Sequence, residues 1–311
     1  MFLSFFFPVK GGKGSLLTKI VTWNTYGQCE NYGSLTGHRG AVLDLQWSGD
    51  SKVIFSASAD MTLASWDLET GQRIRRHLGH EAVVNCVDIS KRGQEILVSA
   101  SDDGSVGIWD PRQRDAIDYL ETDLPITAAS LSEAGNEIYS GGIDNMIHAW
   151  DLRKNAIVYS MSGHTDTITS LQISPDSQTL LSNSHDSTVR TWDIRPFAPT
   201  DRHVNTYDGA PFGLERNLIR ASWDPRGEKI AAGSGDRTAV VWDAKTEKIL
   251  YKLPGHKGPV NDVRFSPNDE PISEFFFFFF FFLVAQMLIE NGFSVVSASS
   301  DRTLLLGELG K

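Results

Sequence analysis

The feature that most constrains the fold is a short pattern that recurs along almost the whole chain. An aspartate is followed, after five intervening residues, by Trp-Asp or a degenerate equivalent, and this happens six times in 311 residues. The positions are Asp60 with Trp66, Asp103 with Trp109, Asp144 with Trp150, Asp186 with Trp192, Asp236 with Trp242, and Asp301 with Gly307-Glu308. Such a period is typical of repeat proteins, in which each unit packs against the next.

Within each unit the sequence predicts β-strands. A Gly-His pair opens four units, and two alternating runs separated by a turn follow it, as in residues 42–47 and 53–58. The tryptophans at positions 66, 109, 150, 192 and 242 lie 43, 41, 42 and 50 residues apart, which is the period of a four-stranded propeller blade. No ten-residue helical pattern interrupts the units. The sequence therefore predicts an all-β propeller.

The first and last units depart from the pattern. Residues 21–24 and 31–35 resemble the last two strands of a blade whose first two are absent, and residues 1–19 have no counterpart in the repeat. Six units and the partial one predict a seven-bladed propeller over residues 20–311, with its first blade truncated and its last interrupted. In the alternative, six blades close the ring and the 31–35 strand completes the final blade.

The interruption of the last unit is an insert at residues 273–294. Its removal would join Ile272 to Val295 and restore a repeat of normal length. The insert begins near eight consecutive phenylalanines, at 275–282. Phenylalanine codons contain only pyrimidines, so a translated polypyrimidine tract gives such a run, and we interpret the insert as translated intron. A hairpin that binds a membrane or a partner is the rival interpretation.

Composition excludes several classes of partner. The chain has 39 acidic and 29 basic residues and a net charge of −10, which disfavours sequence-independent binding to DNA or RNA. Two cysteines, Cys29 and Cys86, give no disulfide framework, so a reducing compartment fits best. The apolar stretches at 1–9 and 275–289 are shorter than the roughly 20 residues that cross a bilayer, so no membrane partner is expected.

These units resemble the WD-repeat family over nearly the whole chain. In that family the histidine after glycine, a strand serine or threonine, the turn aspartate and the tryptophan form a buried hydrogen-bonded network inside each blade. The resemblance implies this role for His38, Asp60 and Trp66, with Ser56 or Ser58 as the hydroxyl. It implies a structural role also for His80, Asp103, Trp109, Asp144, Trp150, His164, Asp186, Trp192, Asp236, Trp242, His256 and Asp301.

Segments outside the repeat signature resemble one branch of this family, the WD-repeat subunits of the spliceosome. They are residues 30–32, 141–145, 192–199, 229–234 and 249–256. The resemblance implies a nuclear scaffold within a small nuclear ribonucleoprotein. Such a scaffold takes part in pre-mRNA splicing by docking onto the large central splicing factor, with small nuclear RNA contacted only indirectly. A propeller fold by itself would not imply this role.

One long link is the candidate partner-binding segment. Residues 195–217 account for the 50-residue tryptophan spacing and carry Arg195, Phe197, Arg202, Phe212 and Arg216. Loops on rigid scaffolds often bind partners, and arginine and aromatic side chains are favoured at interface centres. The alternative is a plain inter-blade loop.

A second function hypothesis comes from three blade ends that read Trp-Asp-x-Arg, at Arg112, Arg153 and Arg195. They resemble substrate receptors of cullin-type ubiquitin ligases, although arginine is common after Trp-Asp. The sequence holds no nucleophile-elbow or zinc-protease motif, and no Cys/His cluster accompanies the repeat histidines. We therefore expect no enzymatic activity, no cofactor and no metal.

Overall fold

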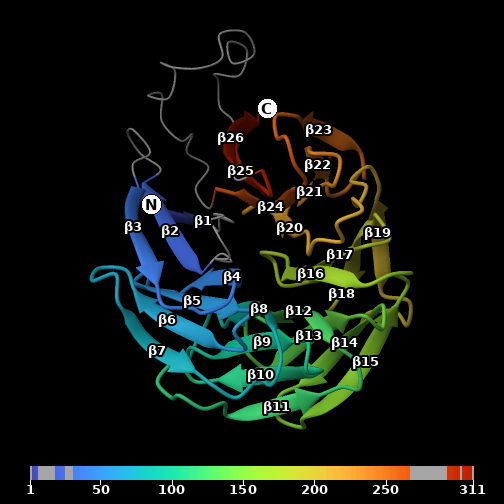
Figure 1. The fold of residues 1–311 in the computed structure, drawn as a ribbon. Coiled ribbons are helices and arrows are strands. Elements are labelled where there is room, and N and C mark those ends of the chain that lie inside the picture. The colour runs from blue at the N-terminus through green and yellow to red at the C-terminus, as the bar shows by residue number, and fades with distance from the viewer. Residues whose placement is uncertain (1, 6–17, 25–30, 267–292, 302, 310–311) are drawn as a thin grey trace.

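The computed structural model describes residues 2–5, 18–24, 31–266, 293–301 and 303–309, which form strands, turns and loops without a helix (Figure 1). The described strands make seven antiparallel sheets, five of four strands and two of three. Six of these sheets stand around a centre like the blades of a propeller (Figure 1). The prediction of an all-β WD40 propeller is confirmed.

Each four-stranded sheet takes four strands that are consecutive in the chain. The strands of the first two are β4 (Val42–Trp47), β5 (Val53–Ser58), β6 (Leu63–Asp67) and β7 (Arg73–His77), then β8 (Val84–Ile89), β9 (Leu97–Ser101), β10 (Ser105–Trp109) and β11 (Asp118–Glu121). The third consists of β12 (Ile126–Leu131), β13 (Glu137–Gly142), β14 (Met146–Asp151) and β15 (Ala156–Ser162). The last two consist of β16 (Ile168–Ile173), β17 (Thr179–Ser184), β18 (Val189–Asp193) and β19 (His203–Tyr207), then β20 (Ala221–Trp223), β21 (Lys229–Gly233), β22 (Ala239–Asp243) and β23 (Ile249–Leu253).

The two three-stranded sheets lie at the ends of the chain. They consist of β1 (Phe2–Phe5), β2 (Lys19–Asn24) and β3 (Asn31–Thr36), and of β24 (Val260–Phe265), β25 (Phe293–Ser299) and β26 (Leu304–Leu309). β3 pairs with β2 and is not a strand of the β24–β26 sheet, so it does not complete the final blade.

The blade count differs from the seven-bladed expectation. Six sheets, from β4–β7 to β24–β26, form the ring, and the sheet β1–β3 stands beside β4–β7 (Figure 1). The reason lies in the sequence, because the segment before β2 lacks the Gly-His pair and the two alternating runs that form the inner strands of a blade. β1, within the stretch we expected to stand apart from the propeller, pairs with β2 instead.

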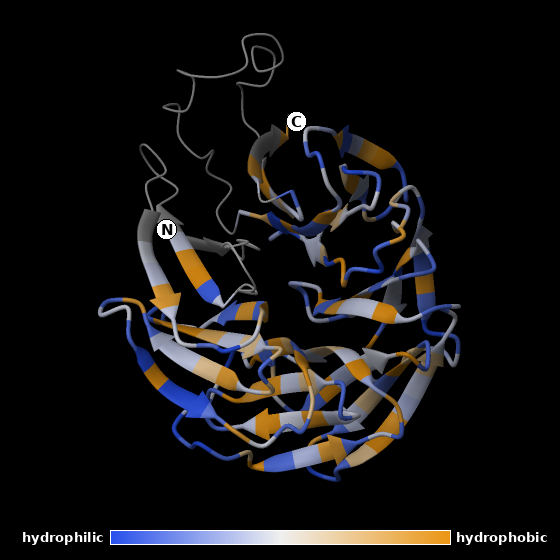
Figure 2. Ribbon diagram, in the orientation of Figure 1, coloured by the Kyte–Doolittle hydropathy of each residue, from blue (hydrophilic) through white to orange (hydrophobic). Residues whose placement is uncertain are grey.

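The hydrophobic core lies between neighbouring sheets. Each buried cluster takes residues from two adjacent blades, as where Ile147 of β14 packs with Ile168 of β16. Ile20 and Leu35 join the sheet β1–β3 to Trp66 of the next sheet in the same way. Figure 2 shows hydrophobic segments alternating with polar ones along the strands. Because each apolar face is covered only by the adjacent blade, the blades stabilise one another.

The predicted insert at 273–294 lies almost wholly outside the described residues, so its origin stays a prediction. The strands that flank it form a hairpin in which Phe265 is paired with Val295. The connection that closes this hairpin runs over residues 266–294.

We predict that deleting residues 273–294 stabilises the protein. The connection would shorten from 29 residues to 7, which lowers the entropy cost of closing the hairpin by about 1 kcal/mol. Urea unfolding measures the change. Replacement of the same residues by a glycine-serine linker of equal length is the control, and it should not reproduce the gain. A deletion variant less stable than the parent would contradict the prediction.

Candidate functional site

A chain of four hydrogen-bonded side chains lies inside the blade β4–β7. The indole Nε1 of Trp66 donates to Ser56 Oγ at 2.8 Å, and the Ser56 hydroxyl lies 2.7 Å from Nε2 of His38. Nδ1 of His38 lies 3.0 Å from the Asp60 carboxylate. Ser56 therefore has the role that the sequence left open between two serines, whereas Ser58 accepts a bond from the backbone of Asp60.

The same three bonds, at 2.7–2.8 Å, recur in two further blades, among Trp109, Ser99, His80 and Asp103 and among Trp192, Ser182, His164 and Asp186. The network fits a neutral imidazole that donates from Nδ1 to the carboxylate and accepts at Nε2 from the serine. Every donor then meets an acceptor. With a second ring proton, the serine would accept from both the ring and the indole, and its own proton would have to go to a backbone carbonyl, such as that of Ala64 at 3.3 Å in the first blade.

Burial and hydrogen bonding shift the titration of these groups. Burial lowers the pKa of His80 and of His164 below the ordinary value, although the aspartate partners oppose this. Burial alone would raise the pKa of Asp103, but hydrogen bonds from Ser105 and His80 outweigh it and lower that pKa to about 2. In these two blades the network therefore holds a neutral histidine beside an ionised aspartate.

The blade β12–β15 has no Gly-His pair, and a histidine on another strand binds its turn aspartate but contacts a different serine from the one that binds the tryptophan. His148 on β14 lies with Nε2 2.6 Å from Asp144, and Nδ1 lies 2.8 Å from the Ser160 hydroxyl. Trp150 still donates to a serine, Ser140, at 2.8 Å. Sequence reasoning missed His148. The available signal was a histidine two residues before the tryptophan, where the first blade has Ala64.

The blade β20–β23 lacks both the histidine and the serine, because Ala232 stands four residues before Asp236. Trp242 donates to the backbone carbonyl of Asp208 at 2.9 Å instead. Asp236 forms an ion pair with Lys252 at 2.6 Å. The predicted residues Asp236 and Trp242 therefore do not share a network.

The last blade keeps the histidine without the tryptophan. His256 lies 2.9 Å from Ser297 Oγ and 3.4 Å from the Asp301 carboxylate.

The turn aspartates of five blades also accept a hydrogen bond from a hydroxyl two residues later, a contact that sequence reasoning missed. These hydroxyls belong to Thr62, Ser105, Thr188, Thr238 and Thr303.

The five candidate partner-binding residues do not form one site. The predicted link contains β19, which pairs with β18 as the outer strand of its blade, so the link is two loops at opposite ends of a strand. Arg195 and Arg202 lie in the first loop, where Arg195 forms an ion pair with Asp193 and Arg202 stacks over Tyr159 at 3.8 Å. Phe197 is fully exposed there.

The other two candidates lie in the second loop, between β19 and β20. Phe212 packs edge-to-face on His185 with ring centroids 4.8 Å apart, and its backbone N–H donates to Ser187. Arg216 is exposed and has a φ of 45°. The strand between the loops was missed because the prolines at 196 and 199 and the absence of a following Gly-His pair hide its pattern.

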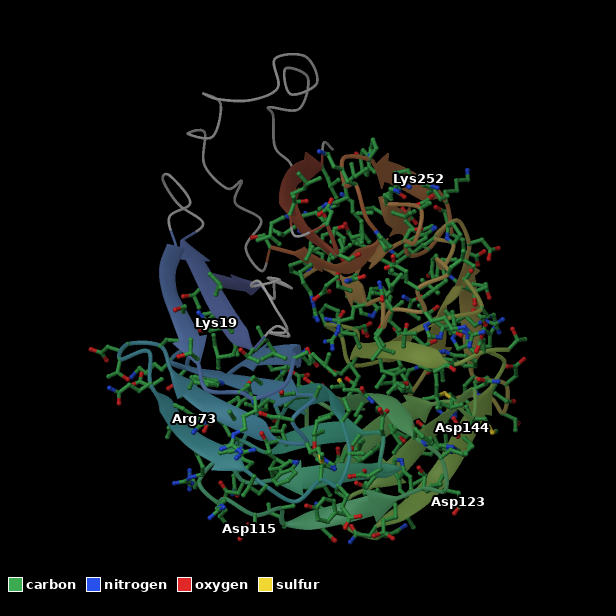
Figure 3. The ribbon with its side chains drawn as sticks, viewed as in Figure 1. Lys19, Arg73, Asp115, Asp123, Asp144 and Lys252 are labelled. Atoms are coloured by element: carbon green, nitrogen blue, oxygen red, sulfur yellow. The ribbon has the colours of Figure 1, made fainter. Side chains whose placement is uncertain are left out.

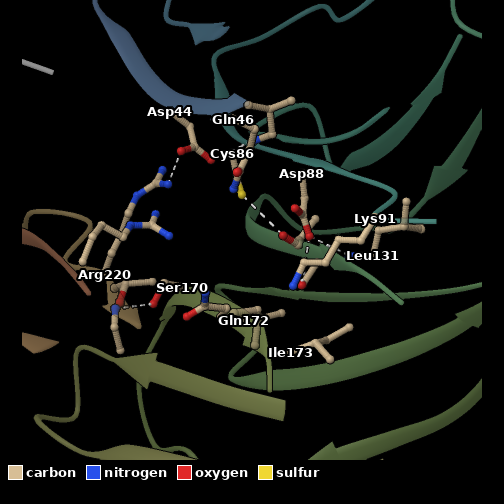
Figure 4. A pocket seen from close by; sticks show the side chains of 17 residues that line it. Asp44, Gln46, Cys86, Asp88, Lys91, Leu131, Ser170, Gln172, Ile173 and Arg220 are labelled. Atoms are coloured by element: carbon tan, nitrogen blue, oxygen red, sulfur yellow. Dashed lines mark hydrogen bonds and ion pairs between the residues drawn. The ribbon is translucent and has the colours of Figure 1, made fainter. Parts of the chain in front are cut away.

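The centre of the ring holds a cavity of about 100 Å³, lined by the first strands of the sheets (Figure 4). Arg220, which precedes β20, reaches across it to the Asp44 carboxylate on β4. The same guanidinium group donates to the carbonyls of Leu43 and Asn85 at 3.1 and 3.3 Å. Burial opposes the charge of Arg220, but Asp44 outweighs it and raises the pKa of the guanidinium.

Side chains around this cavity also bind the backbone of the next blade. Asp44 accepts from the N–H of Val87 at 2.9 Å, and Asp88 accepts from the N–H of Leu131 at 2.9 Å. Gln172 accepts from the N–H of Trp223 at 2.8 Å. These contacts join successive inner strands, so the polar cavity wall serves to hold the ring together.

Two classes of site are not found in the described part of the chain. No group of three His, Cys, Asp or Glu side chains there is placed to share a metal ion. Within the same residues no helix has the length and apolarity needed to span a membrane.

The fold and the blade networks together define a WD-repeat propeller. The WD domain, G-beta repeat family matches residues 29–67, 71–110, 155–193, 215–243 and 247–272. The pre-mRNA-splicing factor cwf17 of Schizosaccharomyces pombe is 43% identical over 296 residues, which are 95% of this chain and 80% of the relative. The U5 small nuclear ribonucleoprotein 40 kDa protein is 45% identical in Homo sapiens, over 93% of this chain and 75% of the relative.

The same-named protein of Dictyostelium discoideum is 40% identical over 94% of this chain and 76% of the relative. The chain belongs to the WD-repeat family of these U5 ribonucleoprotein subunits. The resemblance that the sequence indicated is confirmed.

We predict that Asp186→Ala destabilises the protein more than Asp236→Ala. The first removes the carboxylate that accepts from the buried Nδ1–H of His164 at 2.8 Å and leaves it only the Thr188 hydroxyl at 3.4 Å, which costs about 2 kcal/mol. The second removes a half-exposed ion pair worth about 1 kcal/mol. Urea unfolding of both variants measures the difference. Equal losses would show that the histidine adds nothing to the blade.

We also predict that stability falls as the pH drops from 7 to 5. The folded pKa of His164 is lowered, so below the unfolded value of about 6.5 the unfolded chain binds more protons than the folded one. The stability that ionised Asp103 contributes is lost at lower pH, between about pH 4 and its folded pKa of about 2. His164→Gln should flatten the slope between pH 7 and 5. Asp236→Ala, in a blade without this histidine, should keep the slope, and an unchanged slope in His164→Gln would refute the assignment.

Proposed function

We propose that this protein is a non-enzymatic protein-interaction scaffold of the spliceosome that acts in pre-mRNA splicing in the nucleus by docking onto the large central splicing factor. One observation carries the proposal. The identity with proteins named as splicing factors or U5 ribonucleoprotein subunits reaches 40–45% and extends over at least 93% of this chain. Generic repeat positions alone do not account for identity of that extent.

The structure supports a platform role by its rigidity and its surface charge. The blades are held by buried networks and by backbone contacts across the central cavity, so binding loops stand on a fixed frame. The net charge of −10 opposes direct attraction to phosphate, which fits partners that are proteins, with small nuclear RNA contacted indirectly and no role for DNA or a membrane.

For docking we favour the loop between β18 and β19. Arg195 and Arg202 fix this loop through Asp193 and Tyr159, and Phe197 extends from it fully exposed. A rigidly presented aromatic side chain is well suited to enter a pocket of a partner. Phe212 and Arg216, at the other end of β19, would contact a different part of the partner or a second subunit.

We predict that the tagged full chain captures core splicing factors and small nuclear RNA. Affinity purification with mass spectrometry measures the capture. Phe197→Ser should lower the yield of the large splicing factor severalfold, because it removes an exposed anchor without touching the blade. Leu124→Ser, at an exposed position outside residues 195–217, serves as the matched control and should leave the yield unchanged. Recovery of cullin adaptors without splicing factors would overturn the proposal in favour of a ubiquitin-ligase receptor.

A further inference from the structure

Five arginines gather on the outer rim of the ring beside the blade β4–β7. Three, Arg73, Arg75 and Arg76, belong to the outer strand β7, and two, Arg112 and Arg114, belong to the turn between β10 and β11. We call these residues the arginine band. Figure 3 shows the labelled Arg73 on the outer part of its blade, and in Figure 2 β7 is one of the most hydrophilic strands.

The two segments of the band lie against each other. The guanidinium group of Arg75 donates to the carbonyl of Pro111 at 3.2 Å. The backbone N–H of Leu78 donates to the carbonyl of Arg114 at 3.1 Å, and His77 contacts the carbonyl of Gln113 at 2.8 Å. The band is therefore one continuous surface across two blades.

The guanidinium groups on β7 are positioned by neutral partners. Arg73 donates to the carbonyl of Gly37 at 2.9 Å and lies 5.9 Å from the ring centre of Trp66. Arg76 donates to the Thr62 hydroxyl at 3.3 Å. Each arginine has five N–H donors, so most of them stay available to a ligand.

One carboxylate, Asp115, lies within the band, where it follows Arg114 and is exposed, and no ion pair joins it to the five arginines. Over the residues that the structure describes, no guanidinium group of the band lies within ion-pair distance of an aspartate or glutamate. Other arginines do form such pairs, namely Arg92, Arg195, Arg220 and Arg264. Two acidic neighbours in the sequence are engaged within their own turns, since Asp67 accepts from Thr70 and Asp110 from the N–H of Arg112.

An apolar residue stands within the band. Ile74 is 53% exposed between Arg73 and Arg75. β7 is the outermost strand of its sheet, so a further extended chain has an edge to lie along. Arginine flanking an exposed aliphatic side chain suits a protein ligand with carboxylates and an apolar side chain better than it suits a sugar-phosphate backbone.

We propose that the arginine band binds an extended acidic segment of a protein partner, whose carboxylates meet the guanidinium groups and whose apolar side chain covers Ile74. RNA is the less favoured ligand, because the net charge of −10 opposes long-range attraction to phosphate. The proposal does not rest on the spliceosomal function, since it concerns the chemistry of one surface.

The test uses the full chain and a fluorescein-labelled ten-residue peptide that alternates glutamate with leucine. The triple variant Arg75→Gln, Arg76→Gln, Arg114→Gln should bind it at least about tenfold more weakly than the parent. Lys154→Gln, Lys245→Gln, Lys248→Gln removes the same three charges from other exposed positions and should stay within about twofold. Thermal unfolding followed by circular dichroism establishes that both variants are folded.

Three results would overturn the proposal. The first is absence of binding of the acidic peptide by the parent chain. The second is equal weakening by the two triple variants, which would indicate a general charge effect. The third is tighter binding of a ten-nucleotide oligouridylate than of the peptide, with the same dependence on Arg75 and Arg76, which would assign the band to RNA. If the Arg75, Arg76 and Arg114 variant fails to fold, Ile74→Asp takes its place. This variant should reduce the affinity for the peptide to a similar degree.

Discussion

The blades depend on a buried chain of hydrogen bonds from a tryptophan indole through a serine and a histidine to an aspartate. In the first blade this chain joins the loop before β4, the middle strands and the turn after β5. A blade in which one of these buried polar groups lacked its partner would be less stable than a blade with an apolar interior. The four residues therefore act as a unit. The turn that the aspartate fixes sets where β6 begins, and with it the register of the sheet.

The three blades that depart from this arrangement show what the chain of bonds contributes. His148 restores the histidine from a different strand, so the polar atoms around Asp144 and Trp150 remain satisfied. In the blade β20–β23 the indole of Trp242 donates to a backbone carbonyl instead, and Asp236 forms an ion pair with Lys252 on the outer strand. The indole stays buried in both cases, but only Trp242 has exchanged its serine partner. The last blade has Gly307 in place of the tryptophan and its strands still pair, so the indole is not essential to every blade.

The fold could be predicted from the repeat because the spacing within a unit is local in the sequence. The site was harder to predict because its contacts join residues that are far apart in the sequence. Periodicity placed Asp60 and Trp66 in one unit, whereas β25 begins at Phe293, two residues inside the predicted insert. The bond from Asp44 to the N–H of Val87 joins different blades, so no pattern within one unit could indicate it. β19 was missed for a related reason, since a lone outer strand has no repeat signature of its own.

The division between buried and exposed polar groups also separates stability from recognition. The network aspartates are paired inside the blades, and Asp44 is paired with Arg220 across the central cavity. The outer strands take little part in these networks, and Arg75 and Arg76 on β7 contact only a carbonyl and a hydroxyl. A surface of this kind can change its charge without breaking a blade. The outer rim is therefore where one propeller can differ from another in its partners while the same interior is kept.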